Sequence, residues 1–187
     1  MVEMRHIDFN YYLNIIHYCI WVHERNFDKR YHELLNIAFS PIKYLLPKQI
    51  RLKYEIRKEK ANKYFYELIN DKKNGYSISW AHFWFGYTYS GYSAFISFIL
   101  IGTFLHLLGY INQIILVFIT IIPVGLAYIP AYNAVFKKDK YLAYFKQFEK
   151  EDEQWHKKWK RKTMLFCLGG IVSFISGIIG AILIITH

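Results

Sequence analysis

Charged side chains are missing from two long parts of this chain of 187 residues. The sequence has 24 Lys and Arg and 14 Asp and Glu, yet none of them falls in 74–136 or in 164–187. A soluble domain carries charges over its whole surface, so uncharged stretches of this length exclude a soluble globular protein. Three apolar segments in these ranges, about 91–108, 111–131 and 164–186, are long enough to cross roughly 30 Å of hydrocarbon as helices.

Cysteine is also scarce, and Cys19 and Cys167 lie far apart in the sequence. They form neither a CxxC pair nor a disulfide framework, which argues against metal-ribbon and redox proteins. His17, Cys19 and His23 do not share one helical face, so we assign no metal and no cofactor. Phosphate-binding glycine loops, nucleophile elbows and paired carboxylates are missing too, so no small-molecule substrate is evident. The chain start lacks a signal-peptide pattern and is expected to stay in the cytoplasm.

Lys and Arg also set the expected orientation in the membrane. Residues 1–75 hold 14 of them against 9 acids, residues 137–163 hold 10 against 5, and the loop 109–112 holds none. Cytoplasmic loops of membrane proteins carry the excess of Lys and Arg. We therefore predict an all-α integral membrane protein of the bacterial inner membrane with three transmembrane helices. Both basic regions are expected in the cytoplasm and the C-terminus outside.

The same pattern predicts four consecutive parts of the chain. Residues 1–75 form a cytoplasmic or interfacial helical region, and 76–131 an aromatic belt followed by a two-span hairpin. Residues 132–163 form cytoplasmic amphipathic basic helices, and 164–187 the third transmembrane helix. Aromatic rings favour the headgroup region. The belt is therefore either an interfacial entry or the outer turns of a long first span.

Further helices are expected in the cytoplasmic regions. The segment 7–22 is apolar except for a stripe of Asn10, Asn14 and His17 at helical spacing. It is read as a core-facing helix, as an interfacial helix, or as an arm that lines an opening. Residues 132–163 contain neither Gly nor Pro and should be helical, with an aromatic face. That face needs a partner, either within the chain or from a neighbouring subunit, and we favour a helix over 48–71 of the same chain.

Small and hydroxylated residues mark the apolar segments. Gly169, Ser173, Gly177 and Ala181 fall four residues apart, and small residues let helices approach closely in lipid. The partner helix belongs either to the same chain or to another subunit. A ring of subunits could enclose a pore with a polar lining. Two sets could supply that lining: Thr88, Ser90, Ser93 and Ser97, or Asn10 and Asn14.

One pattern has the residue types of a catalytic site. Arg25 and Asn26 are followed by His32, which matches the Arg-x(4–6)-His signature of HEPN ribonucleases. In such chemistry a His moves the proton of a ribose hydroxyl and an Arg stabilises charge on the phosphorane. The alternative reading is a solvated, helix-capping charge cluster. Whether the protein is an enzyme stays open, and the balance favours a protein without catalysis.

Basic cytoplasmic helices that carry Arg25-Asn26…His32 and join membrane spans resemble the divergent-HEPN membrane accessory proteins of type VI-B CRISPR loci. The tight hairpin followed by a charged helix over 91–150 is also similar to the SLATT family of membrane defence effectors, although a third span departs from the simplest SLATT pattern. The resemblance implies a homo-oligomeric pore that permeabilises the membrane and enhances antiphage defence. The partners implied are the lipid bilayer, further copies of the chain, and an RNA-guided effector protein or its RNA. A membrane-tethered HEPN ribonuclease and a non-catalytic scaffold or immunity protein are the alternatives.

Overall fold

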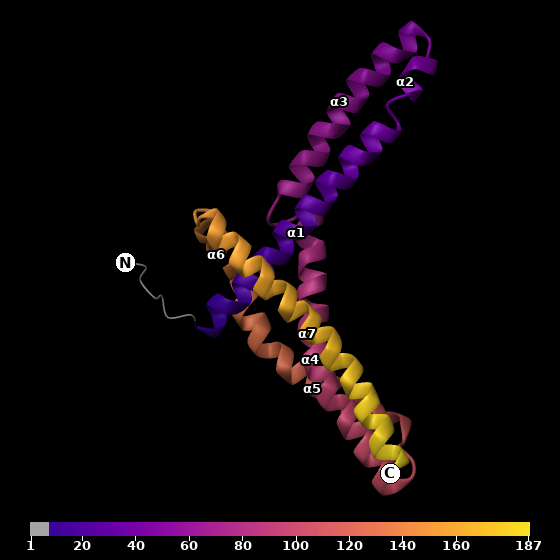
Figure 1. The fold of residues 1–187 in the computed structure, drawn as a ribbon, viewed down its shortest axis with the longest axis vertical. Coiled ribbons are helices and arrows are strands. Elements are labelled where there is room, and N and C mark those ends of the chain that lie inside the picture. The colour runs from indigo at the N-terminus through magenta and orange to yellow at the C-terminus, as the bar shows by residue number, and fades with distance from the viewer. Residues whose placement is uncertain (1–7) are drawn as a thin grey trace. The chain divides into compact units, whose positions relative to one another are not determined.

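A computed structural model of the chain describes residues 8–187, apart from the side chains of Ile42, Leu45 and Lys48. These residues form helices and no strand, which confirms the predicted all-α fold. Ile7, where the first helix was expected to begin, lies outside the described range. In chain order (Figure 1) the elements are α1 (Phe9–Ala38), α2 (Ile42–Leu45), α3 (Lys48–Asn70), α4 (Tyr76–Leu108), α5 (Gln113–Val135), the 3-10 helix η1 (Lys137–Asp139), α6 (Lys140–Phe148) and α7 (Glu153–Thr186).

The chain divides into two compact units. We call Phe83–His187, together with the described residues up to Cys19, the membrane unit, and Ile20–His82 the arm. Helices α1 and α4 run without a break through these boundaries, so each contributes residues to both units.

Within the described residues, three helices are long and apolar enough to cross a membrane: α4, α5 and α7. The chain is therefore a membrane protein with three candidate transmembrane helices, as the uncharged ranges predict. α4 has 33 residues and α7 has 34. At 1.5 Å per residue each is about 50 Å long, which exceeds the hydrocarbon thickness of roughly 30 Å. The residues of the expected aromatic belt are helical and continuous with the apolar part of α4.

The hairpin between α4 and α5 is closed by local hydrogen bonds. Gly109 follows α4 with a φ of 73°, a conformation that favours glycine, and its N–H donates to the Leu105 carbonyl at 2.9 Å. Asn112 precedes α5, and its side chain accepts from the Ile114 N–H at 2.9 Å. These caps fix the loop at 109–112, so α5 begins at Gln113, two residues later than expected.

Helices α4 and α7 touch through their backbones (Figure 1). A Cβ added to Gly91 would lie 2.7 Å from the Gly170 carbonyl oxygen, and one added to Gly177 would lie 2.9 Å from the Phe95 Cα. At the far end, a Cβ on Gly102 would lie 2.8 Å from the Ala181 Cα. From one pair to the next, the residue number increases in both helices. The two spans therefore run in the same direction with almost no side chain between them.

The predicted small-residue positions divide between these contacts. Gly177 and Ala181 are buried against α4, while Gly169 lies beside the Tyr92 ring and Ser173 is half-buried. The closest approach on this turn is made by Gly170, one residue later. The partner is a span of the same chain, which was one of the two options left open by the sequence.

Residues 132–163 are helical but are interrupted twice. Lys138 and Asp139 adopt left-handed φ angles of 59° and 53° between α5 and α6, and 149–152 separate α6 from α7. Asp152 then caps α7, because its carboxylate accepts from the Trp155 N–H at 2.7 Å. No Gly or Pro marks either break, so the sequence alone indicated a longer helix.

The aromatic face of 132–163 packs on α1. Tyr141, Phe145 and Phe148 are buried, and the Phe148 ring lies 5.3 Å from Tyr11 and 5.5 Å from Tyr18. The partner is the first helix of the chain, so the expected pairing with 48–71 is wrong. Residues 13–18 of α1 are all buried, which selects the core-facing reading of this helix.

The arm is a helical hairpin in which α3 runs back beside the second half of α1 (Figure 1). Ile20, Trp21, Ile69, Ile78 and Ala81 form its core. At its base the Asp71 carboxylate accepts from the N–H groups of Lys73 and Asn74, which lowers the pKa of Asp71. A Cβ on Gly75 would overlap the carbonyl oxygens of Leu68 and Asp71, so only glycine fits this turn.

Replacing Gly177 by alanine tests the contact between α4 and α7. The new methyl group would press on the Phe95 backbone, and the spans would have to move apart at a cost of roughly 1–3 kcal/mol. Gly125→Ala is the matched control, because no atom lies within 4 Å of a Cβ at that position in α5. We expect Gly177→Ala to lower the thermal unfolding temperature in detergent and Gly125→Ala to leave it unchanged or raise it. Equal effects would show that the glycine contact is not formed.

Candidate functional site

The most enclosed polar side chains of the membrane unit are Asn14 and His17 on α1, both fully buried. The Asn14 amide donates to the Asn10 carbonyl in its own helix at 2.8 Å and to the Ala134 carbonyl at the end of α5 at 2.9 Å. The Asn14 Oδ1 atom is also buried and has no hydrogen-bond partner among the described residues. Buried polar atoms cost free energy unless they are paired. The bond to the Ala134 carbonyl therefore holds α1 on α5, while the unpaired Oδ1 atom lowers the stability of this contact.

The His17 ring is surrounded by aromatic rings from three other elements. The centroids of Phe85 on α4, Phe136 after α5, and Tyr141 and Phe145 on α6 all lie 5.3–5.5 Å from that of His17. Three of these contacts are edge-to-face, the arrangement that aromatic pairs prefer. His17 therefore serves as an aromatic centre where α1, α4 and α6 meet.

Cys19 follows this buried segment and lies beside Thr163 of α7. Burial raises the pKa of the Cys19 thiol to about 11. A thiol with so high a pKa is protonated at neutral pH and is a poor nucleophile or metal ligand. Among residues 8–187, no three His, Cys, Asp or Glu side chains gather in an arrangement that could hold a metal ion.

Most of the polar residues that the sequence offered as a pore lining are buried in the single chain: Asn14, Thr88, Ser93 and Ser97. Ser90 is half-buried and Asn10 is exposed. The Ser93 hydroxyl donates to the Ser90 carbonyl at 3.0 Å, and the Ser97 hydroxyl donates to the Thr120 carbonyl of α5 at 3.2 Å. The Ser97 hydroxyl thus links α4 to α5, while the Ser93 hydroxyl bonds within α4.

In the arm, Arg25 lies against a buried aromatic ring. Its guanidinium carbon is 4.6 Å from the centroid of the fully buried Trp21 ring, a cation–π contact. Nearby, the Ser77 hydroxyl donates to the Asp28 carboxylate at 2.6 Å. Burial, and secondarily the charge of Asp28, raise the pKa of Glu24. Arg25 is thus part of a packed, charged cluster at the base of the arm.

His32 is engaged on the same side of α1. Its Nε2 atom is 2.9 Å from the Asn62 Oδ1 atom, and its ring stacks on Phe65 with centroids 3.9 Å apart. Arg25 and His32 are seven residues apart and so share one helical face about 10 Å apart along the axis. Asn26 is exposed beside them. Arg25 and His32 therefore share one face of α1, and each has its own contacts there: Arg25 with Trp21, and His32 with Asn62 and Phe65.

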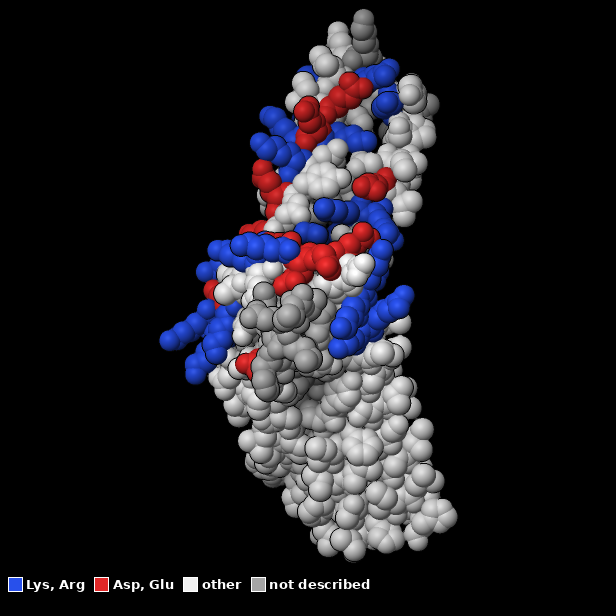
Figure 2. Space-filling view, turned by 60° about the vertical axis from the view of Figure 1, so that its left-hand side comes forward, with Lys and Arg blue, Asp and Glu red and all other residues white. Residues whose placement is uncertain are grey.

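A belt of aromatic and basic side chains surrounds one end of the spans. Because Gly91 meets Gly170, the residues two turns earlier on α4 and α7 lie at one level. These are the exposed Phe83 and Trp84 on α4, and Lys162 on α7, whose Nζ atom lies 4.4 Å from the centroid of the Trp159 ring. In Figure 2 the charged side chains and a large uncharged surface occupy separate parts of the visible face. Such a belt suits the headgroup region of anionic lipid.

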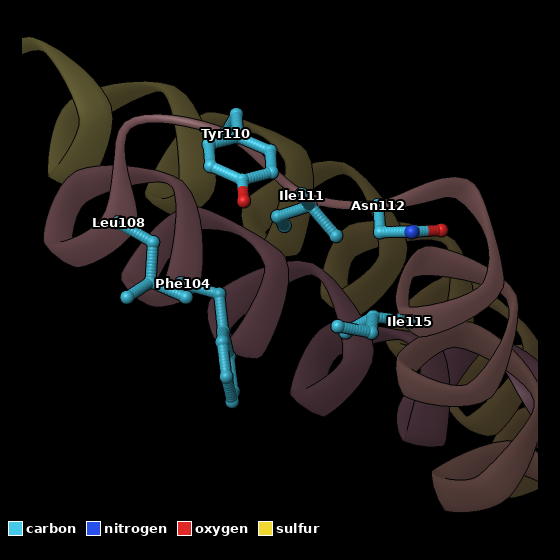
Figure 3. Close-up of a pocket in the computed structure, with 6 residues that line it drawn as sticks. All are labelled: Phe104, Leu108, Tyr110, Ile111, Asn112 and Ile115. Atoms are coloured by element: carbon cyan, nitrogen blue, oxygen red, sulfur yellow. The ribbon is translucent and has the colours of Figure 1, made fainter.

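A shallow hollow lies at the opposite end of the spans, beside the hairpin loop (Figure 3). Its volume is about 270 Å³ and its lining is largely apolar. The residues around it are Phe104, Leu108, Tyr110, Ile111, Asn112 and Ile115. Asn112 already caps α5. The lining contains no carboxylate, imidazole or thiol, and the Tyr110 phenol is its one ionisable group.

Comparison with protein-family models, with curated proteins and with solved structures finds no match to this chain. The class is therefore defined by the fold and its surfaces alone. It is an all-α membrane protein in which three apolar helices are joined to a first helix that is buried over residues 13–18.

Sequence reasoning missed the glycines that make the closest helix contacts, Gly91, Gly102 and Gly170. The signal was present in part, because Gly91 and Gly102 stand eleven residues apart in the same apolar segment and so fall on one face. Ala131 and Ala134, which make room for α1 at the end of α5, are buried as well. Their spacing of three also places them on one face.

Exchanging Asn14 for aspartate tests the buried contact between α1 and α5. A carboxylate cannot donate to the Ala134 carbonyl and would be buried without a counter-charge, so we expect a loss of roughly 3 kcal/mol or more in the free energy of unfolding. Asn10→Asp is the control, because Asn10 is exposed in the first turn of the same helix. Thermal unfolding in detergent measures both. The loss should shrink as the pH falls toward 4, because the protonated group can donate again.

Alkylation of Cys19 tests its surroundings. In a Cys167→Ala variant at pH 8, we expect iodoacetamide to modify Cys19 about a hundredfold more slowly than an ordinary thiol of pKa about 8.5, since only the thiolate reacts. The rate should rise tenfold per pH unit up to about pH 11. A cysteine introduced by Asn26→Cys, at an exposed position of α1, provides the reference in the same molecule. Equal rates at the two positions, followed by mass spectrometry, would contradict the burial of Cys19.

Proposed function

We propose that this protein is a bacterial membrane effector that assembles from several copies and permeabilises the inner membrane in antiviral defence. One observation carries the proposal. The described surface is rich in exposed apolar and aromatic side chains suited to association, while Arg25 and His32, the side chains suited to catalysis, are engaged in packing within the arm. The resemblance to accessory proteins of type VI-B CRISPR loci supports the same class.

In this proposal the opening forms between copies of the chain. The hydroxyl groups of α4 are used inside one copy, and the glycine contacts between α4 and α7 are satisfied there as well. The outer faces of the spans, especially α5, remain for contacts with lipid or with neighbouring copies. A trigger shifts the assembly between closed and open states by binding one of them more tightly. An RNA-guided effector protein or its RNA is the expected trigger.

The proposed orientation places both basic regions in the cytoplasm, and the loop 109–112 and the C-terminus outside. The aromatic and basic belt supports this orientation, because five cationic side chains of α7 fall just before its apolar part: Lys157, Lys158, Lys160, Arg161 and Lys162. Clusters of this kind bind anionic lipid on the cytoplasmic side.

A second candidate is a membrane-tethered ribonuclease. The observation in its favour is that Arg25 and His32 share one face of α1, so a conformational change in the arm could present both to RNA. A scaffold without conductance or cleavage is the third candidate. The three differ in what the purified protein does in a bilayer.

Conductance of planar bilayers that contain the purified protein tests the proposal. We expect stepwise currents that increase with protein density and that persist in Asn26→Ala, since Asn26 is exposed. RNA cleavage by the same preparation, compared with Arg25→Ala, tests the ribonuclease. A silent bilayer with verified insertion, together with cleavage lost in Arg25→Ala, would replace the pore by the ribonuclease. Silence in both assays would favour the scaffold.

A further inference from the structure

The arm exposes a regular apolar stripe on α1. Phe27, Tyr31, Leu34 and Ala38 are spaced by four, three and four residues, which is the seam spacing of a coiled coil. Phe27, Tyr31 and Leu34 are 59%, 56% and 64% exposed. The rings of Phe27 and Tyr31 lie nearly parallel, with centroids 6.4 Å apart and an angle of 8°. We call these four residues the arm stripe.

The arm does not cover this stripe itself. The side of α1 that packs on α3 carries polar groups, with His32 against Asn62 and Phe65. The core of the arm is apolar, yet the regularly spaced apolar residues of the arm stripe lie outside that core. Exposed apolar residues at seam spacing are typical of a surface that a partner covers.

Charge indicates which partner fits. Residues 20–38 hold three acids and three bases in mixed order and are neutral: Glu24, Arg25, Asp28, Lys29, Arg30 and Glu33. By contrast, α3 has seven bases against three acids. Anionic lipid or nucleic acid would be drawn to α3, whereas a neutral helix with mixed charges is complementary to a copy of itself.

From the spacing, the exposure and the charge we infer that the arm stripe pairs with the arm stripe of a second copy as a short two-stranded coiled coil. The inference rests on the proposed assembly from several copies and names one of its interfaces. Four seam positions make a weak contact between free molecules. In a membrane all copies share one orientation and diffuse in two dimensions, so the arms lie on the same side at a high effective concentration.

Disulfide cross-linking in native membranes tests the pairing. In a Cys19→Ala/Cys167→Ala background, Leu34→Cys places a thiol in the stripe, and Glu33→Cys places one at the same level but outside it. Both positions are exposed. With a mild oxidant we expect a dimer band at least tenfold stronger for Leu34→Cys. Equal bands, or none for Leu34→Cys, would overturn the pairing.

Two further measurements separate the pairing from the assembly. The subunit count in detergent-free membrane particles shows whether copies associate at all. Several copies without a Leu34→Cys cross-link would overturn the pairing and leave the proposed function standing, while single copies would overturn both. An environment-sensitive dye attached to Leu34→Cys tests whether lipid, instead of a second copy, covers the arm stripe. A blue shift on vesicles of anionic lipid, without cross-linking, would assign the stripe to the membrane surface and overturn the pairing.

Discussion

The close contact between α4 and α7 is the constraint on which the membrane unit depends. Lipid chains are as apolar as the helices, so two spans gain little from hiding apolar surface and are held by tight packing. Gly91 against Gly170 and Gly102 against Ala181 allow the backbones to touch. This contact fixes the parallel register of the spans. It thereby places the aromatic rings of α4 level with the cationic cluster of α7, and it leaves α5 with the most exposed surface.

The first helix completes the unit at the end of the spans. Residues 13–18 of α1 are enclosed by α4, the end of α5 and α6, with Asn14 bonded to Ala134 and His17 among aromatic rings. The two left-handed residues between α5 and α6 make this possible, because they turn α6 so that its aromatic face meets α1. The same helix continues to Ala38 and contributes the Arg25–His32 face to the arm. Its catalytic-looking residues therefore sit on an element whose first half is structural.

Much of the fold follows from the distribution of charge, because the apolar parts of the three candidate spans lie in the ranges 74–136 and 164–187, which carry no charges. The caps at Gly109 and Asn112 are also visible in the sequence. The contact residues are harder to predict. Four-residue steps from Gly169 to Ala181 drift by about 40° each on a helix of 3.6 residues per turn, so a straight seam uses Gly170 and Gly177 instead. The breaks at 136–139 and 149–152 carry no Gly or Pro, so the local sequence does not predict them. The partner of the aromatic face depends on these breaks and could not be predicted either.

The central claim is that this protein acts by association in the membrane. Counting the copies in particles cut directly from the bilayer, by native mass spectrometry at several expression levels, tests it most directly. The account predicts a defined complex of more than one copy whose size does not change with expression. A single copy at every level, in particles that retain the lipid, would contradict it.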